Sequence, residues 1–271
     1  MADKKQQNTW FFKVGLVLTV FMVTIILIGQ FWTPYDPSAQ NAAEKALGPS
    51  LAHIMGTDYL GRDIFSRVMD GAGTTLFIAF FVVLLGSAAG ILVGALTGYL
   101  GGIVDTVLMK ICDSITAFPS ILLAMIILKV LDRPGKWTVI WVLAILFIPS
   151  FARVSRTEYV RIKKQNYISL ARLEGASPAR IMALHILPNA FPVLLPAITI
   201  GFNNAVLAEA SMSFLGVGVS ATEASLGRML SDAQNYLVTG LPWYALCVGG
   251  TIVLLILGFS LLAEGLQQRR K

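Results

Sequence analysis

Residues 77–96 read FIAFFVVLLGSAAGILVGAL, a run of twenty residues without a charged side chain. A helix needs about 20 mostly apolar residues to cross the hydrocarbon core of a membrane. A strand of a membrane β-barrel would instead alternate apolar and polar residues over about ten positions, and this run shows no such alternation. The stretch therefore predicts a transmembrane α-helix, which decides the fold class.

Similar runs recur along the whole chain of 271 residues. Hydrophobic residues make up 56% of it and charged residues 13%, whereas a typical soluble domain has about 25% charged residues. We therefore predict an all-α, polytopic membrane protein with six transmembrane helices, the third of which carries a few charges. The predicted spans are Trp10–Trp32, Thr75–Thr97, Ile103–Leu128, Trp137–Ala152, Ile186–Phe214 and Leu241–Leu262.

These spans divide the chain into three parts. Residues 1–32 hold a tail and the first span, residues 33–74 form a segment outside the membrane, and residues 75–271 form a core of five helices. Loops on the cytoplasmic side tend to be rich in lysine and arginine. Both termini and the loop after the fourth span are basic, so we expect them in the cytoplasm and residues 33–74 on the outer side.

A basic and polar loop lies at residues 153–188, RVSRTEYVRIKKQNYISLARLEGASPARIMALHILP. Its first part, Thr157–Glu174, is rich in helix-forming residues, and Gly175 follows where a left-handed C-cap is common. The serine and proline at 177–178 suit the N-cap and first position of a second helix, which we expect Pro188 to interrupt. The loop therefore predicts a helix-turn-helix at the cytoplasmic face.

Two functions remain open for this helix-turn-helix. Its basic residues suit an amphipathic hairpin that lies on anionic lipid. The small residues at its turn instead allow close approach to a second protein, which favours a docking surface for a soluble partner.

The end of the loop, GASPARIMALHILPN at residues 175–189, resembles the Glu-Ala-Ala loop of the permease subunits of ATP-binding-cassette importers. Gly175 takes the place of the motif's glycine, whereas Ser169 stands at its glutamate and His185 at its isoleucine. The resemblance implies a coupling helix that sits in a cleft of an ATPase subunit. The coupling residues that it implies are Ser169, Leu170, Ala171, Glu174, Gly175, Ala176, Ser177 and Pro178.

Other blocks resemble the dipeptide, oligopeptide and nickel permeases within that family. They read FWTPYDP at 31–37, MGTDYLGRDIFSRVMDGAGTTL at 55–76, AFPSILLA at 117–124 and LAEASMSFLGVGV at 207–219. The resemblance implies the type I permease fold and the second permease subunit of a peptide or nickel importer in a bacterial inner membrane. It also implies three kinds of partner: a homologous permease, two ATPase subunits and an extracytoplasmic substrate-binding protein.

Several classes of function are disfavoured by what the sequence lacks. There is no GxxxxGK[ST] phosphate loop, the motif that cradles nucleotide phosphates. We therefore expect ATP and magnesium to bind in the partner subunits and no cofactor to bind this chain. No cysteine and histidine spacing indicates a metal site, and basic residues beside membrane spans do not indicate nucleic acid.

Polar residues inside membrane spans are usually functional or paired, because burying them in lipid is costly. In the third span, Lys110 and Asp113 have the spacing of an ion pair on one helix face, and we place Asp105 near the cytoplasmic interface. The polar residues of the fifth span either line a translocation path or form helix–helix hydrogen bonds between subunits. They are Asn203, Asn204, Glu209, Ser211 and Ser213.

The segment outside the membrane holds a second polar cluster, formed by Asp58, Arg62 and Asp63. Thr57 or Asp58 suits the N-cap of a helix that runs through Arg67. The cluster is then either a cap with an ion-pair network or part of an extracytoplasmic gate or receptor contact.

Two other functions compete with a permease subunit. An ion-coupled secondary transporter, the main alternative, would need its own coupling site and often contains internal repeats. An intramembrane enzyme would need a catalytic group of residues in the spans, but the two histidines, His53 and His185, are isolated and lie outside them. We therefore predict no catalytic residue and no enzyme activity in this chain.

Overall fold

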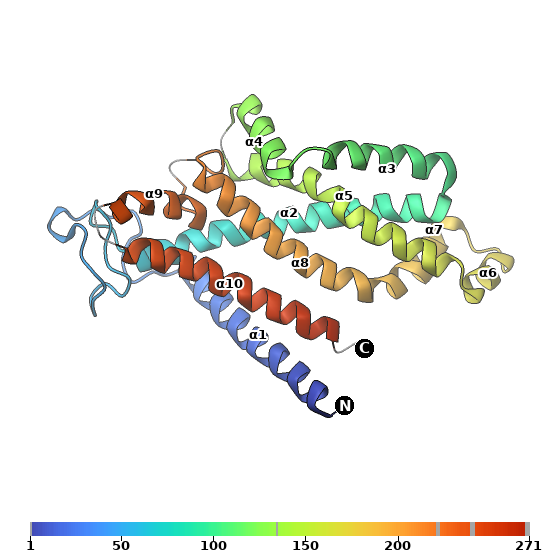
Figure 1. Ribbon diagram of the computed structural model, residues 1–271, viewed down its shortest axis with the longest axis horizontal. Coiled ribbons are helices and arrows are strands. Elements are labelled where there is room, and N and C mark those ends of the chain that lie inside the picture. The colour runs from blue at the N-terminus through green and yellow to red at the C-terminus, as the bar shows by residue number, and fades with distance from the viewer. Residues whose placement is uncertain (1, 134, 221–222, 239–241, 269–271) are drawn as a thin grey trace. The chain divides into compact units, whose positions relative to one another are not determined.

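The computed structural model describes residues 2–133, 135–220, 223–238 and 242–268. These residues form helices joined by loops, with no β-strand among them (Figure 1). The elements are α1 (Ala2–Gly29), the 3₁₀ turn η1 (Ala42–Glu44), α2 (Ile64–Leu100), α3 (Gly102–Thr116), α4 (Ser120–Leu131), α5 (Lys136–Lys163), α6 (Asn166–Leu173), α7 (Pro178–Arg180), the π-helical turn η2 (Ile181–Ile186), α8 (Leu187–Phe214), α9 (Leu226–Val238) and α10 (Trp243–Gln268).

The helices confirm an all-α, multi-pass membrane protein. Five helical stretches are long and apolar enough to cross a membrane, and α3 with α4 forms a sixth candidate. The second span begins at Ile64, within the segment predicted to lie outside, and α2 has 37 residues. Such a helix is about 55 Å long, well beyond the roughly 30 Å hydrocarbon core. The five stretches are Trp10–Gly29, Ile64–Leu100, Lys136–Lys163, Pro178–Phe214 and Trp243–Gly265.

The third span differs from the single helix predicted at Ile103–Leu128. Helix α3 ends at Thr116, α4 begins at Ser120, and the two axes are bent by 84°. Pro119 lies at the break, where its missing N–H and its ring prevent the helix from continuing. The pair is therefore a broken span or a re-entrant loop.

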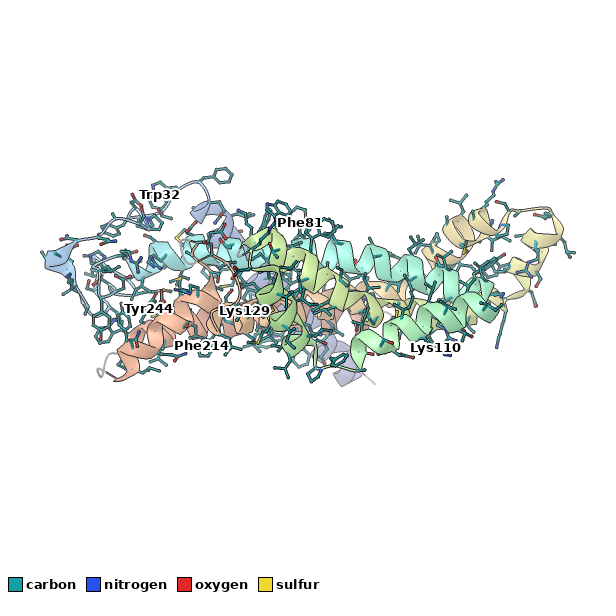
Figure 2. All side chains as sticks on the ribbon, turned by 90° about the horizontal axis from the view of Figure 1, so that it is seen from above. Trp32, Phe81, Lys110, Lys129, Phe214 and Tyr244 are labelled. Atoms are coloured by element: carbon teal, nitrogen blue, oxygen red, sulfur yellow. The ribbon has the colours of Figure 1, made fainter. Side chains whose placement is uncertain are left out.

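The charges on α3 are paired differently from the prediction. Asp113 accepts a hydrogen bond from Arg153 of α5 at 2.9 Å, and Asp105 accepts two from Arg156 at 2.6 Å each. The predicted Lys110–Asp113 pair is wrong, because these arginines reach the carboxylates from a neighbouring helix. Lys110 lies exposed on α3 (Figure 2), without an ion pair to any residue that the structure describes.

The chain forms two compact units. The first unit comprises Met1–Ala79, Leu128–Val139 and Asn203–Lys271, and the second comprises Phe80–Ile127 and Ile140–Phe202. In the first unit, α1 and α10 lie side by side and antiparallel (Figure 1). Gly15 of α1 permits this approach, since a Cβ there would lie 2.5 Å from the amide nitrogen of Leu262.

In the second unit, α2 and α5 approach each other through a glycine ridge. Its glycines recur at every fourth position and therefore share one helix face. A Cβ at Gly94 would lie 2.4 Å from the carbonyl oxygen of Ala152, and one at Gly98 would lie 2.7 Å from that of Arg156. Small residues at this spacing let two membrane helices pack closely. The glycine ridge consists of Gly86, Gly90, Gly94 and Gly98.

Candidate functional site

The predicted helix-turn-helix lies in the second unit, with one more break than expected. Helix α5 continues past Ala152 to Lys163, and a separate helix, α6, begins at Asn166. The single helix predicted at Thr157–Glu174 is therefore wrong. Ile162 and Ile168 are both buried, but residues six apart on one helix point in directions about 120° apart. The break lets both side chains reach the same core.

This core anchors residues 164–187, which the sequence predicts to dock a partner and which we call the docking segment. Helix α6 buries Ile168 and Ala171, spaced three apart, and the Tyr159 hydroxyl donates a hydrogen bond to the carbonyl of Met182 at 3.1 Å. The segment is thus packed on α2 and α5 rather than hanging free. The buried members of the core are Ala95, Tyr99, Tyr159, Ile162, Ile168, Ile181, Ile186, Ala190 and Leu194.

The turn between the two helices confirms the predicted caps. Gly175 has φ +86°, and its amide bonds to the carbonyl of Arg172 while the amide of Ala176 bonds to that of Ala171. These two bonds form a Schellman motif. The Ser177 hydroxyl then accepts a hydrogen bond from the amide of Arg180 at 3.3 Å, with Pro178 at the first helical position. The sequence prediction of this turn is therefore confirmed residue by residue.

The second helix does not end at Pro188 as predicted. It passes through the π-helical turn η2 into α8, so residues Pro178–Phe214 form one helical stretch. In η2 the amide of Leu187 bonds to the carbonyl of Met182, five residues back, and the Asn189 side chain donates to the carbonyl of His185 at 2.7 Å. This looser turn accommodates the proline, which lacks an N–H and would clash in a regular helix.

The free face of α6 carries exposed apolar side chains. Leu173 is 84% exposed, Leu170 57% and Tyr167 43%. Large exposed apolar patches are typical of interaction sites. Of the eight predicted coupling residues, Ala171 is buried and Ala176 half-buried, and the others are exposed. Tyr167 and Leu173 are not among the predicted coupling residues, although both lie off the face that Ile168 and Ala171 bury.

The polar residues predicted in the fifth span lie in the first unit and serve different contacts. Glu209 is fully buried and accepts hydrogen bonds from the hydroxyls of Thr75, at 2.8 Å, and Ser213, at 2.7 Å. The Asn203 amide donates to Ser260 of α10 at 2.8 Å. Asn204 is exposed and Ser211 half-buried. Asn203, Glu209 and Ser213 thus make side-chain hydrogen bonds. Asn204 and Ser211 are the two of the five that lie nearest to the surface, where a residue that lines a translocation path must lie.

We expect Glu209→Ala to destabilise the protein by about 2–4 kcal/mol, because it leaves the buried hydroxyls of Thr75 and Ser213 without an acceptor. The Thr75 oxygen also accepts the amide of Leu226, so the loss would loosen the start of α9. The apparent melting temperature of the purified protein in detergent measures the effect. Asn204→Ala, on the same helix but exposed, is the control. Equal melting temperatures for the two variants would contradict a structural role for Glu209.

The outer polar cluster forms two separate turns. Asp58 accepts hydrogen bonds from the amide of Leu60 at 2.8 Å and from the amide of Arg62 at 2.9 Å. It also accepts one from the Arg62 Nε at 2.6 Å. Asp63, not Thr57 or Asp58, caps α2 by accepting the amide of Ser66 at 2.7 Å. Each carboxylate therefore closes the turn that immediately follows it, because it lies two to four residues before the amides it accepts.

His53 is not isolated, contrary to the prediction. It is 4% exposed, and its Nδ1 lies 2.9 Å from Oδ1 of Asp63, the carboxylate oxygen that does not bond to Ser66. The segment is also attached to α9, since the amide of Tyr59 donates to the hydroxyl of Tyr236. Burial raises the pKa of Tyr236 above its usual range. The stretch that precedes α2 is thus an ordered part of the first unit.

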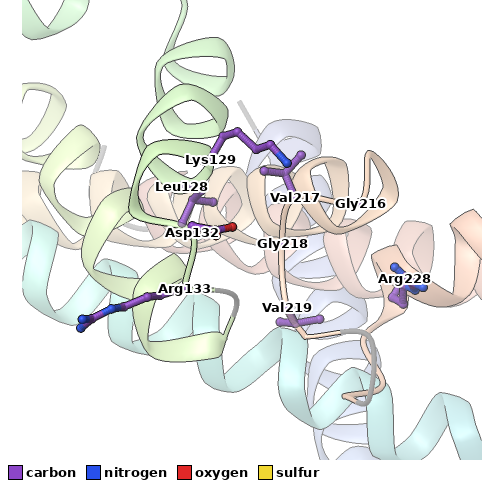
Figure 3. A pocket seen from close by; sticks show the side chains of 9 residues that line it. All are labelled: Leu128, Lys129, Asp132, Arg133, Gly216, Val217, Gly218, Val219 and Arg228. Carbon is purple, nitrogen blue, oxygen red and sulfur yellow. The ribbon is translucent and has the colours of Figure 1, made fainter.

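The described part of the first unit also holds pockets, of which two are lined by several charged residues. One, of about 300 Å³, lies between the end of α4 and residues 216–219 (Figure 3). There Lys129 extends toward Val217, whereas Arg133 points away, and both side chains are exposed. The other, of about 400 Å³, is strongly charged and lies against the outer segment. Among the residues that the structure describes, no three His, Cys, Asp or Glu side chains gather as a metal site.

The chain is similar to known proteins over nearly its whole length. A family model described as "Binding-protein-dependent transport system inner membrane component" matches residues 90–271. The chain is 32% identical to the dipeptide transport system permease protein DppC of Haemophilus influenzae, covering 96% of this chain and 92% of that relative. It is 34% identical to the oligopeptide transport system permease protein OppC of Bacillus subtilis, covering 94% and 83%.

A solved structure supports the same fold. The chain resembles an inward-facing structure of the MetNI methionine ABC transporter with a TM-score of 0.57 and 20% identity, covering 74% of this chain and 96% of that chain. The likeness shows the fold of a type I ABC importer permease.

Proposed function

Because the chain belongs to the family of binding-protein-dependent transport system inner membrane components, we propose that it is a permease subunit that imports short peptides at the expense of ATP. The two relatives described above are named for dipeptides and oligopeptides, which favours peptides over nickel. The observation that carries the coupling role is the apolar free face of α6, exposed at the end of a rigidly capped segment.

The proposed complex places this chain beside a homologous permease, with two ATPase subunits on the cytoplasmic side and a substrate-binding protein on the outer side. ATP and magnesium bind in the ATPase subunits, where hydrolysis occurs. The basic residues around the docking segment and near both termini support a cytoplasmic position for these parts. Residues 33–63 then face the outer compartment.

Contacts within the second unit support transmission of movement from the docking segment to the membrane helices. A displacement of α6 is carried to α5 and α8 by the shared buried core and by the Tyr159–Met182 hydrogen bond. Helix α5 is in turn fixed to α2 by the glycine ridge and to α3 by the Asp105–Arg156 pair. Rigid packing of this kind moves as a body, because packed interiors deform little. ATP-driven closure of the ATPases would thus open and close the path between two permeases.

Co-purification and transport test this function. We expect the affinity-tagged chain, expressed with its neighbouring genes, to bring down an ATPase subunit, and the complex in proteoliposomes to import radiolabelled alanyl-alanine only with ATP and the binding protein. The same complex with a non-hydrolysable nucleotide is the control. Uptake by this chain alone, driven by an ion gradient without ATP, would instead support a secondary transporter.

A further inference from the structure

The charged pocket of the first unit is enclosed by three segments. Its walls are the loop at residues 37–40, the first turns of α2 with the turn before them, and the region from Glu223 through the first half of α9. At about 400 Å³, it falls within the size range of small-molecule sites, roughly 300–1,000 Å³. Its charged lining residues are Arg62, Arg67, Asp70, Glu223, Arg228 and Asp232.

Two of these charged side chains each have a buried atom without a hydrogen-bond partner. Arg67 is only 8% exposed, and its Nε has no hydrogen-bond partner. The Glu223 Oε2 is also buried and without a partner. Among the described residues, neither side chain forms an ion pair, whereas Arg62 pairs with Asp58. A buried polar atom without a hydrogen-bond partner is unfavourable, so the arrangement indicates a site that an outside group completes.

The wall formed by α2 and the wall formed by α9 each carry charges of both signs. Arg67 and Asp70 lie on α2, and Glu223 and Asp232 lie on or before α9. No ion pair between described residues joins the α2 wall to the α9 wall, since Arg228 approaches Asp232 of its own helix, at 3.6 Å. With three cationic and three anionic residues in its lining, the pocket suits a ligand that is neutral overall but carries separated charges.

We infer that this pocket binds the zwitterionic ends of a short free peptide on the outer side of the membrane. Arg67 receives the terminal carboxylate, because the guanidinium fork matches carboxylate geometry. Glu223 and Asp70 receive the terminal ammonium group. This inference rests on the proposed function, since it takes the zwitterion to be the transported peptide. The depth of Arg67 favours a small ligand over a side chain of a docked protein.

Direct binding to the assembled transporter tests the pocket without interference from the binding protein. Radiolabelled alanyl-alanine is titrated onto the purified complex of permeases and ATPases in nanodiscs, with no binding protein present. We expect weak, saturable binding, which Arg67→Gln and Glu223→Gln each weaken about tenfold through loss of a charged hydrogen bond. Lys45→Gln, an exposed charge outside the pocket, should leave binding unchanged. N-acetyl-alanyl-alaninamide, which lacks both charges, should compete poorly.

Any one of three results would overturn the inference: absence of saturable binding, equal competition by the capped peptide, or unchanged binding in Glu223→Gln. Glu223 is half-buried, so Glu223→Gln decides the question if Arg67→Gln fails to assemble. Weaker capture of the loaded binding protein, with unchanged peptide binding, would identify a protein-docking site instead. Peptide uptake by the complete wild-type system is measured in parallel: its failure refutes the proposed function, whereas its success without pocket binding refutes only this inference.

Discussion

Gly94→Leu is expected to abolish assembly of a functional transporter, the largest effect of any single change in the membrane helices. A Cβ at this position would lie 2.4 Å from the carbonyl oxygen of Ala152 and 2.6 Å from the Cβ of Ser155. Backbone atoms of α5 cannot rotate away, so α2 and α5 must separate. Overpacking of this kind costs about 1–3 kcal/mol or more, and separation would also disturb the Ser155–Ile91 hydrogen bond of 3.1 Å.

The yield of detergent-purified protein that elutes as a single species in size-exclusion chromatography measures this effect. We expect the yield of folded Gly94→Leu to fall about tenfold or more, because the overpacked helices cannot assemble. Ala88→Leu is the matched control, because Ala88 lies on the same helix but is exposed. Wild-type yield and melting temperature in Gly94→Leu would show that α2 and α5 do not pack through the glycine ridge.

Leu173→Asp should eliminate ATP-dependent uptake while leaving the permease folded. Leu173 is 84% exposed at the last position of α6 and takes no part in the buried core. A carboxylate placed in an apolar contact loses hydration without gaining a partner. Because central interface residues contribute about 2 kcal/mol or more each, the ATPase should be lost from the complex at working concentrations.

Two readouts separate docking from folding in this variant. The amount of ATPase that co-purifies with tagged Leu173→Asp should drop at least about tenfold, with an unchanged melting temperature of the permease. Leu51→Asp provides the control, since Leu51 is fully exposed in the outer segment. Normal uptake by Leu173→Asp would contradict the docking role and favour the lipid-contact interpretation of the helix-turn-helix.

The sequence predicted those features that depend on residues close together in the chain. The membrane helices follow from uncharged runs, and the turn at residues 174–178 follows from a glycine, a serine and a proline in the right order. Both are local preferences that tertiary contacts did not override. The break between α5 and α6 was missed because it depends on Ile162 and Ile168 sharing one core, a condition that no local propensity expresses.

Features that depend on partners far apart in the sequence could not be predicted. Asp113 and Lys110 are ideally spaced on one helix, yet Asp113 pairs with Arg153, forty residues away. Glu209 was predicted either to line a path or to form a hydrogen bond between subunits. It instead contacts Thr75 of the same chain, which requires knowing that α2 and α8 meet there. The glycine ridge, in contrast, was readable from its four-residue spacing and was overlooked.

The two caps that meet at Gly175 and Ser177 have a thermodynamic consequence for association. Backbone groups and one hydroxyl satisfy the ends of both helices, so the docking segment holds its shape before any partner arrives. Ordering flexible residues on binding consumes part of the interaction energy, and a preorganised surface avoids that loss. The entropy of this surface is therefore reduced once, during folding, rather than in every encounter. A change that only loosened the turn would then weaken the complex without removing a single contact.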